Sequence, residues 1–275
     1  MAFLSFKIIN SSFEGVSSFG LGIFISSSRT AFFTTVFSFF SEPQSVRNKS
    51  PSNENMSIFV FAMDYQTFID SVSNLKDFSL PGKKAHLLTA PLGRKESVNK
   101  LPVDFPNARK AAVLLYCYPK KGVMHLSLIK RSTYDGPHSG QISFPGGKPE
   151  SNDENLWQTA LRECKEELGV HPKQTKPLLN LTPLYIPPSN FLVSPFVAID
   201  DFLPLFNEDP REVKQHIEIP LHELIRLKVK QTPLDEHLYK GVSVPSYVYQ
   251  EHIIWGATAM ILSEFKVFLE YCALI

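Results

Sequence analysis

Residues 144–170 read FPGGKPESNDENLWQTALRECKEELGV, and this stretch decides how the rest of the chain is interpreted. On a helix, Glu163, Glu166 and Glu167 stand at i, i+3 and i+4, so their carboxylates share one face. The adjoining face is apolar, as expected of a helix packed on a core. Its side chains are Trp157, Ala160, Leu161, Cys164 and Leu168. Clustered carboxylates repel one another, and Mg²⁺ relieves that repulsion because it prefers oxygen ligands.

The sequence also predicts where this helix begins and ends. Ser151 and Glu154 have the spacing of a capping box, and the two residues between them are competing N-caps. Gly146 and Gly147 come before the helix, where a sharp turn and a close backbone approach require glycine. Gly169 follows the last turn as the expected C′ residue. A glycine turn, a capped helix and aligned carboxylates together indicate a site for metal and phosphate.

Residues 147–170 resemble the Nudix box, G-x5-E-x7-R-E-U-x-E-E-x-G-U, in which U is aliphatic. The second half of the motif fits residues 162–170. Counting from Gly147, Asp153 falls at the first acidic position of the motif, and the spacer to Arg162 is one residue longer than in the motif, so Glu154 competes for that position. A solvated acidic helix face is the alternative interpretation, and the flanking glycines disfavour it.

The resemblance implies a role for each charged residue of the box. Glu163, Glu166 and Glu167 would be ligands of Mg²⁺, with Mn²⁺ as an alternative metal, and the Gly147 carbonyl would add a ligand. Arg162 stands at the edge of the carboxylate face, where a guanidinium orients a carboxylate through paired hydrogen bonds. The predicted catalytic set is Arg162 with the three glutamates.

The general base stays open at this point. One of the three box glutamates could accept a proton from the attacking water, and so could Glu208 or Glu212 from a later loop. Glu212 is equally consistent with an ordinary solvated residue.

A second segment narrows the resemblance. Residues 129–147, IKRSTYDGPHSGQISFPGG, look like the segment of the coenzyme A pyrophosphatase branch, roughly LLTxRSxxLRxHxGQxxFPGG. The Leu-Arg pair of that pattern is replaced by Asp135 and Gly136, so one expected cation is missing. The matching residues are Arg131, Ser132, His138, Gly140, Gln141, Phe144, Pro145, Gly146 and Gly147. With further matches near Pro195-Phe196 and in 212–221, the resemblance covers most of residues 75–270.

The branch resemblance implies hydrolysis of the pyrophosphate of coenzyme A or acyl-CoA to 3′,5′-ADP and (acyl-)4′-phosphopantetheine. Arg131, His138, Gly146 and Gly147 would contact the substrate, although His138 is equally consistent with a structural residue. The alternatives are a Nudix pyrophosphatase for ADP-ribose or a dinucleotide, and a Nudix module that senses a nucleotide without cleaving it. The presence of all three box glutamates disfavours the sensor.

Charge and cysteine content restrict the class of protein. The formal net charge of +1 provides no global field for nucleic acid or an anionic membrane, so we expect a small nucleotide substrate as the partner. A homodimer is left open. Three widely spaced cysteines, Cys117, Cys164 and Cys272, form neither a metal motif nor a disulfide framework, which suits the cytoplasm.

Residues 1–62 differ from the rest of the chain, with 14 serines and 12 of the 22 phenylalanines. Lys7, Glu14 and Arg29 interrupt the apolar runs, so no uncharged membrane span is present there. We expect this extension to be disordered, or to lie upstream of a true translation start at Met63. Residues 63–275 would then be the Nudix domain, with the box at 147–170.

The coarse element pattern predicts an α/β fold. Apolar runs of strand length occupy 111–118, 124–129, 141–144, 178–186, 191–199, 213–219 and 247–254. Helical periodicity marks 65–75, the box helix, 221–227 and 257–271. Helices and strands alternating along the chain predict a three-layer α/β/α sandwich, and the resemblance implies a mixed β-sheet.

Overall fold

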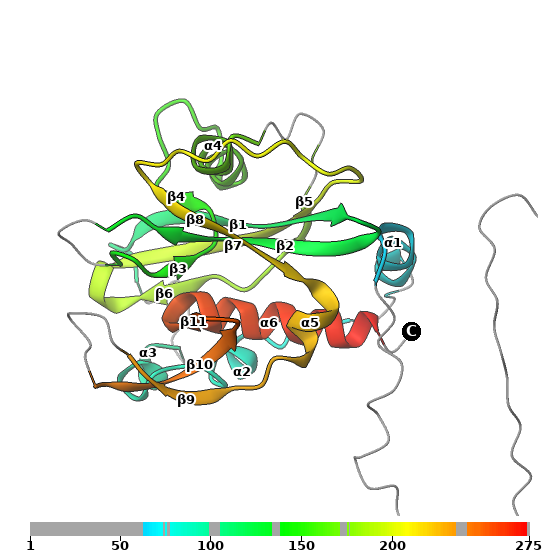
Figure 1. Ribbon diagram of the computed structural model, residues 1–275. Coiled ribbons are helices and arrows are strands. Elements are labelled where there is room, and N and C mark those ends of the chain that lie inside the picture. Colours follow the sequence, from blue (N-terminus) through cyan, green and yellow to red (C-terminus); the bar gives the residue numbers. More distant parts are fainter. Residues whose placement is uncertain are drawn as a thin grey trace, which may run out of the picture. The chain divides into compact units, whose positions relative to one another are not determined.

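The computed structural model describes most of the chain from Met63 onward, within a unit that spans Asn53–Ile275 (Figure 1). The described residues are 63–73, 75, 78–98, 105–133, 138–170, 175, 177–234 and 241–273. The predicted N-terminal extension, residues 1–62, and the substituted pair Asp135-Gly136 lie outside the described residues.

Within the described residues, eight strands form one mixed sheet. They are β1 Arg109–Lys120, β2 Val123–Arg131, β3 Ile142–Ser143, β4 Gly146–Gly147, β5 Pro177–Asn180, β6 Leu184–Ile186, β7 Phe191–Ile199 and β8 Val213–Pro220. β1 and β7 run parallel, whereas the other pairings of this sheet are antiparallel. β3 pairs with β2 and β4 pairs with β1, so the chain passes from the edge of β2 to the edge of β1 between Ile142 and Gly147.

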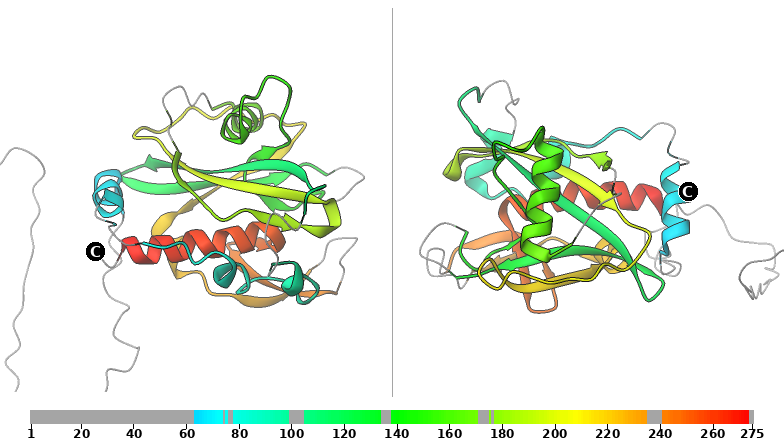
Figure 2. Two further views of the ribbon diagram at one scale, coloured as in Figure 1. Left: turned by 180° about the vertical axis from the view of Figure 1, so that it is seen from behind. Right: turned by 90° about the horizontal axis from the view of Figure 1, so that it is seen from above.

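Two long helices cover opposite faces of this sheet, α4 (Leu156–Leu168) on one and α6 (Gly256–Cys272) on the other (Figures 1 and 2). Side chains of β1 alternate between the two faces: Tyr116 packs in the cluster beneath α4, and Leu115 in the cluster beneath α6. The remaining helical segments are α1 Tyr65–Ser73, α2 Lys83–His86, η1 Leu92–Arg94, α3 Lys95–Val98, η3 Pro187–Ser189 and α5 Leu221–Arg226. Among the described residues, no helix is both long and apolar enough to cross a membrane.

A second, three-stranded sheet lies on the α6 side of the large sheet, and its last strand contacts β3 (Figure 1). Its strands are β9 Lys230–Pro233, β10 Ser243–Tyr249 and β11 His252–Trp255. The single strand predicted over 247–254 is therefore wrong, because the chain reverses at Gln250 (φ 51°) and pairs Tyr249 with His252. β9 was not predicted because its residues are mostly exposed and polar, without apolar alternation.

The predicted fold class is confirmed, an α/β fold with a mixed sheet between helices. The hairpin of β1 and β2 follows the prediction, with Lys120 opposite Val123. The structure differs from the predicted elements in two further places. The predicted strand 178–186 is divided into β5 and β6, and residues 83–98, for which no element was predicted, contain short helices. These differences leave the position of α4 over the sheet unchanged.

Candidate active site

Helix α4 begins later than its sequence suggests. Asn155 is the N-cap, and its side-chain oxygen accepts a hydrogen bond of 3.0 Å from the Gln158 amide. The capping box predicted from Ser151 and Glu154 is therefore wrong, because the N-cap lies four residues after Ser151. The predicted end is confirmed, since Gly169 adopts φ 70° and its amide bonds to the Lys165 carbonyl.

The apolar face of α4 packs on the sheet as predicted. Ala160, Cys164 and Leu168 are fully buried in the cluster beneath the helix, and Trp157 and Leu161 pack at its edge. Burial raises the pKa of the Cys164 thiol, which confirms a small buried apolar residue rather than an exposed nucleophile. This packing fixes the polar face of the helix toward β4 and the loop before β8.

The two glycines of β4 allow the β4 backbone to lie directly against β1 and against the Glu163 carboxylate. Gly146 has φ 154°, and a Cβ there would lie 2.3 Å from the Ala112 carbonyl oxygen. A Cβ on Gly147 would lie 2.3 Å from Oε1 of Glu163. Any side chain at these positions would displace β1 or the Glu163 carboxylate, so the paired glycines are a requirement of the site.

Arg162 is the centre of a charged cluster on α4. Its guanidinium donates to Glu166 Oε2 at 2.8 Å, to Glu163 Oε1 at 3.1 Å and to the Lys148 carbonyl at 2.8 Å. It also donates from Nε and Nη2 to Asp153 at 3.1 Å each. These hydrogen bonds lower the pKa of Asp153 to about 2. Arg162 thus links three carboxylates, rather than forming the single bidentate pair that the sequence suggested.

The same contacts distinguish the two candidates for the first acidic position of the box. Asp153 is held by Arg162 and by the Thr159 hydroxyl at 2.9 Å. Glu154, which is exposed, instead accepts a hydrogen bond from the Gln158 side chain. The geometry therefore joins Asp153, and not Glu154, to the carboxylate cluster.

Glu167 is the most buried carboxylate of α4, with 1% of its surface exposed. It accepts a hydrogen bond of 2.9 Å from the Gly146 amide and one of 3.2 Å from Arg131. Its pKa is raised to about 8, chiefly because burial disfavours the charged form. Arg131 and the Gly146 amide act against this rise, whereas the charges of Glu163 and Glu212 add to it.

Glu163 lies in a similar electrostatic environment. Burial raises its pKa, Arg162 acts to lower it, and the nearby charges of Glu166 and Glu212 raise it. Glu212 therefore affects both Glu163 and Glu167, although it comes from a different part of the chain. The site thus contains four carboxylates, among which Glu163 is repelled by Glu166 and Glu212, and Glu167 by Glu163 and Glu212.

The loop between β7 and β8 reaches the site through backbone contacts that sequence reasoning missed. The Asn207 amide donates to the Leu168 carbonyl at 2.9 Å, and the Asp209 amide to the Glu167 carbonyl at 3.0 Å. These contacts join residues about 40 positions apart, so no local spacing could predict them. The only signal in the sequence is the acidic run Glu208-Asp209 shortly before Glu212.

The predicted substrate contacts divide between two groups. Arg131 and Gly146 bind Glu167, and Gly147 lies against Glu163, so these three meet the carboxylates. His138 is placed differently, in a turn with φ 69° and with Nδ1 3.0 Å from Gln141 Oε1. The contact of His138 is thus with its own turn, which favours the structural alternative for this residue.

Comparison with known proteins agrees with this geometry. The NUDIX domain model matches residues 108–241. The protein named uncharacterized Nudix hydrolase NudL of Photorhabdus laumondii is 35% identical over 184 residues, 61% of this chain and 92% of its own length. The NudL protein of Yersinia enterocolitica is 37% identical over 160 residues, 57% of this chain and 79% of its own length. The chain belongs to the Nudix hydrolase family.

Membership of the Nudix hydrolases makes the chain a hydrolase of pyrophosphate bonds in nucleotide derivatives. Among solved structures, it is similar to a Nudix hydrolase from M. smegmatis, RenU, with 15% identity and a TM-score of 0.38. That similarity covers 61% of this chain and 88% of the other.

Nudix hydrolases generally need divalent metal ions, typically Mg²⁺. Within the described residues, no three His, Cys, Asp or Glu side chains already form a metal-binding group. The reason is visible in the contacts: Arg162 holds Glu163 and Glu166, while Glu167 turns to Gly146. The donors nevertheless fit the metal chemically, because hard carboxylate oxygens that repel one another would be stabilised by a hard cation. Glu163, Glu166 and Glu167 would hold it.

Proposed function

We propose that this Nudix hydrolase cleaves the pyrophosphate of coenzyme A or acyl-CoA, giving 3′,5′-ADP and (acyl-)4′-phosphopantetheine. One observation carries the proposal. The segment 129–147, which bears the resemblance to the coenzyme A branch, contacts the box at two points, since both Arg131 and Gly146 donate to Glu167. The segment that would select the substrate is thereby joined to a carboxylate that would act on it.

In the proposed reaction, a water oxygen attacks one phosphorus and the bond from that phosphorus to the bridging oxygen breaks. The bound Mg²⁺, or Mn²⁺, would neutralise phosphate charge and favour ionisation of the water. Arg162 positions Glu163 and Glu166 by direct hydrogen bonds. Glu212 would accept the proton of the water, because it is an exposed carboxylate that faces the cluster from another element.

We also propose a cytoplasmic location. Cys117, Cys164 and Cys272 are all free and buried, which suits a reducing compartment. The partner required by this function is a small nucleotide substrate.

The test is hydrolysis of coenzyme A, dephospho-coenzyme A, ADP-ribose and a dinucleotide by the full chain, with and without Mg²⁺. Preferential, metal-dependent release of 3′,5′-ADP is expected. Efficient cleavage of ADP-ribose or the dinucleotide instead would retain the Nudix chemistry and overturn the substrate. Glu166→Gln should lower turnover by orders of magnitude at saturating Mg²⁺, and near-normal activity would overturn its assignment as a ligand.

A further inference from the structure

The turn that carries Glu212 is built around the Asp209 carbonyl. It ends the loop between β7 and β8, which passes the C-terminal end of α4 (Figure 1). The Asp209 carbonyl accepts the amides of Glu212 at 3.0 Å and Val213 at 2.8 Å, and the Asp209 amide donates to the Glu167 carbonyl. On the other side of the turn, the Ser132 amide donates to the Glu212 carbonyl at 2.8 Å. The position of Asp209 therefore sets the position of Glu212 relative to α4.

The residues just before this turn attach to His216 of β8 through two side chains. The ring centroids of Phe206 and His216 are 4.3 Å apart. Oε1 of Glu208, the neighbour of Asp209 in the chain, lies 3.4 Å from His216 Nδ1. Leu203 and Leu205, earlier in the same loop, are 51% and 92% exposed, so they contribute little packing.

His216 is in turn fixed to the sheet. Its Nε2 lies 2.9 Å from the hydroxyl of Ser127 on β2. Burial lowers the pKa of His216, the charges of Glu218 and Glu208 act to raise it, and Lys120 lowers it. A neutral ring can donate from Nδ1 to Glu208 while Nε2 accepts from the Ser127 hydroxyl. Ser127 is fully buried, which excludes a nucleophilic role for this Ser-His-Glu arrangement and leaves a link from β2 to the loop.

We propose that Glu208 and His216 are positioning residues, which hold the turn 209–212 so that the Glu212 carboxylate faces Glu163 and Glu167. The inference rests on the proposed role of Glu212 as the acceptor of the proton of the water. It also separates the two later carboxylates that the sequence offered as a general base. Glu212 affects Glu163 and Glu167, whereas Glu208 lies against His216.

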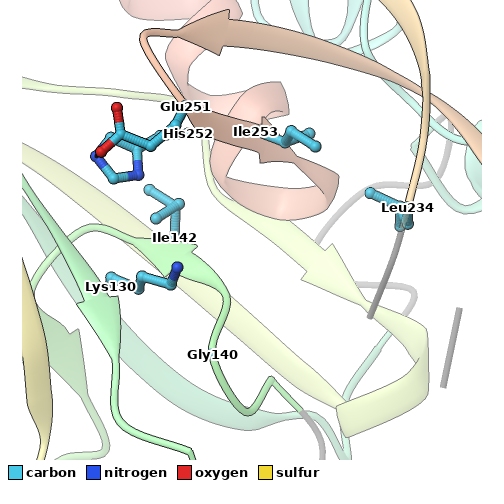
Figure 3. Close-up of a pocket in the computed structure, with 7 residues that line it drawn as sticks. All are labelled: Lys130, Gly140, Ile142, Leu234, Glu251, His252 and Ile253. Carbon is cyan, nitrogen blue, oxygen red and sulfur yellow. The ribbon is translucent and has the colours of Figure 1, made fainter. Parts of the chain in front are cut away.

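The first test asks whether the pair holds the turn. Amide hydrogen exchange of residues 206–213 is measured in the metal-free, full-length wild type, Glu208→Ala and His216→Asn. Both variants should exchange this segment about tenfold faster, because opening the turn then breaks one hydrogen bond fewer, while exchange in β1 stays unchanged. Glu251→Ala is the matched control, since it removes the carboxylate of a similar pair, in which Glu251 Oε1 lies 3.5 Å from His252 Nε2 (Figure 3). An unchanged exchange rate in residues 206–213 would overturn the proposal.

The second test asks whether catalysis depends on the pair through Glu212. Values of kcat and KM are measured for coenzyme A and ADP-ribose at saturating Mg²⁺. Glu208→Ala should lower kcat about tenfold and leave KM unchanged, because a misplaced base affects the chemical step and not nucleotide binding. Glu208→Gln should recover most of kcat, since its amide oxygen still accepts from His216, whereas a general base would stay inactive as glutamine. In the Glu212→Gln background, Glu208→Ala should cause no further loss.

The outcomes separate this inference from the proposed function. An unchanged kcat in Glu208→Ala, a Glu208→Gln variant as impaired as Glu208→Ala, or additive losses in the double variant would each overturn the positioning role, even if coenzyme A is cleaved. Full activity of Glu212→Gln would show that the proposed base is wrong and would overturn the positioning role with it. If ADP-ribose is cleaved in place of coenzyme A, only the proposed substrate fails, and the same comparisons on ADP-ribose decide the positioning role.

Discussion

Two buried glutamates lie on opposite sides of the large sheet and behave in opposite ways. Glu167 on α4 is 1% exposed, and Glu264 on α6 is 0% exposed. The pKa of Glu167 is raised to about 8, whereas that of Glu264 is lowered. Burial alone would raise both, so the difference lies in their neighbours.

The neighbours of Glu264 are all donors. Its carboxylate accepts hydrogen bonds from the Gly82 amide at 2.9 Å and from the Thr182 amide and hydroxyl at 2.9 and 2.7 Å. His86 Nε2 lies 3.3 Å from it. Glu167 has Arg131 and one amide as donors, but it also faces other carboxylates. A buried carboxylate with several hydrogen-bond donors stabilises the fold, whereas a buried carboxylate that faces other acids would be stabilised by a bound cation.

The largest effect should come from Glu167→Gln. We expect kcat to fall about 10³-fold, because a charge that would bind metal is lost. We expect little change in the thermal midpoint of the metal-free protein, because the neutral amide can still accept from Gly146. Steady-state kinetics at saturating Mg²⁺ and a thermal melt measure the two quantities. Glu223→Gln, an exposed residue of α5, is the control. A large loss of stability with activity retained would make Glu167 a structural residue like Glu264.

Glu264→Gln should lower the thermal midpoint and leave kcat unchanged, which is the reverse of the effect expected for Glu167→Gln. An amide replaces one acceptor oxygen by a donor, which leaves two of the surrounding donors unpaired at a cost of about 3 kcal/mol. For a domain of this size, that lowers the thermal midpoint by roughly 6–12 °C. The kcat of the folded fraction should be unchanged. Glu270→Gln, half exposed on the same helix, is the matched control. If Glu264→Gln were as stable as wild type, the contrast between the two glutamates would be lost.

The contrast also explains how much the sequence could predict. Glu167 belongs to a cassette whose helix, glycines and arginine lie within 25 residues, so local spacing was enough to place it. Glu264 is held by residues from three distant segments, near Gly82, His86 and Thr182, and no spacing rule connects them. Periodicity predicted helix α6 but could not distinguish its buried carboxylate from an exposed one.

The rest of the site also depends on contacts between residues that are far apart in the chain. The approach of Asp209 to Glu167 depends on how the loop before β8 folds over the end of α4. A cavity lined by Lys130 is completed by Glu251 and His252 (Figure 3), which come from the β10–β11 hairpin that was predicted as one strand. Contacts between residues close together in the chain were predictable, whereas contacts between segments far apart in the chain were not.

Substitutions of Arg162 test whether catalysis requires that the carboxylates of α4 be held in place. Arg162→Ala should lower kcat about 10²-fold, because Glu163 and Glu166 lose the donor that positions them. Arg162→Lys should recover only part of this loss, since a point charge cannot bridge Asp153, Glu163 and Glu166 together. Kinetics for both variants, with Arg109→Ala as an exposed control, measure the effect. Full activity of the lysine variant would show that charge alone, and not geometry, is required.

The smallest effect should appear in the pH dependence of stability. The pKa of Glu264 is lower in the folded protein than its unfolded value of about 4.3, so its contribution is present above that pH. It is lost as the pH falls through the folded pKa. The difference in unfolding free energy between wild type and Glu264→Gln should therefore shrink, by at most ~1.4 kcal/mol per pH unit. Urea titrations from pH 7 to pH 3 measure this difference and cancel the similar contribution of Asp153, whose pKa is about 2. A difference that stayed constant down to pH 3 would mean that hydrogen bonding to a neutral Glu264, and not its charge, stabilises the fold.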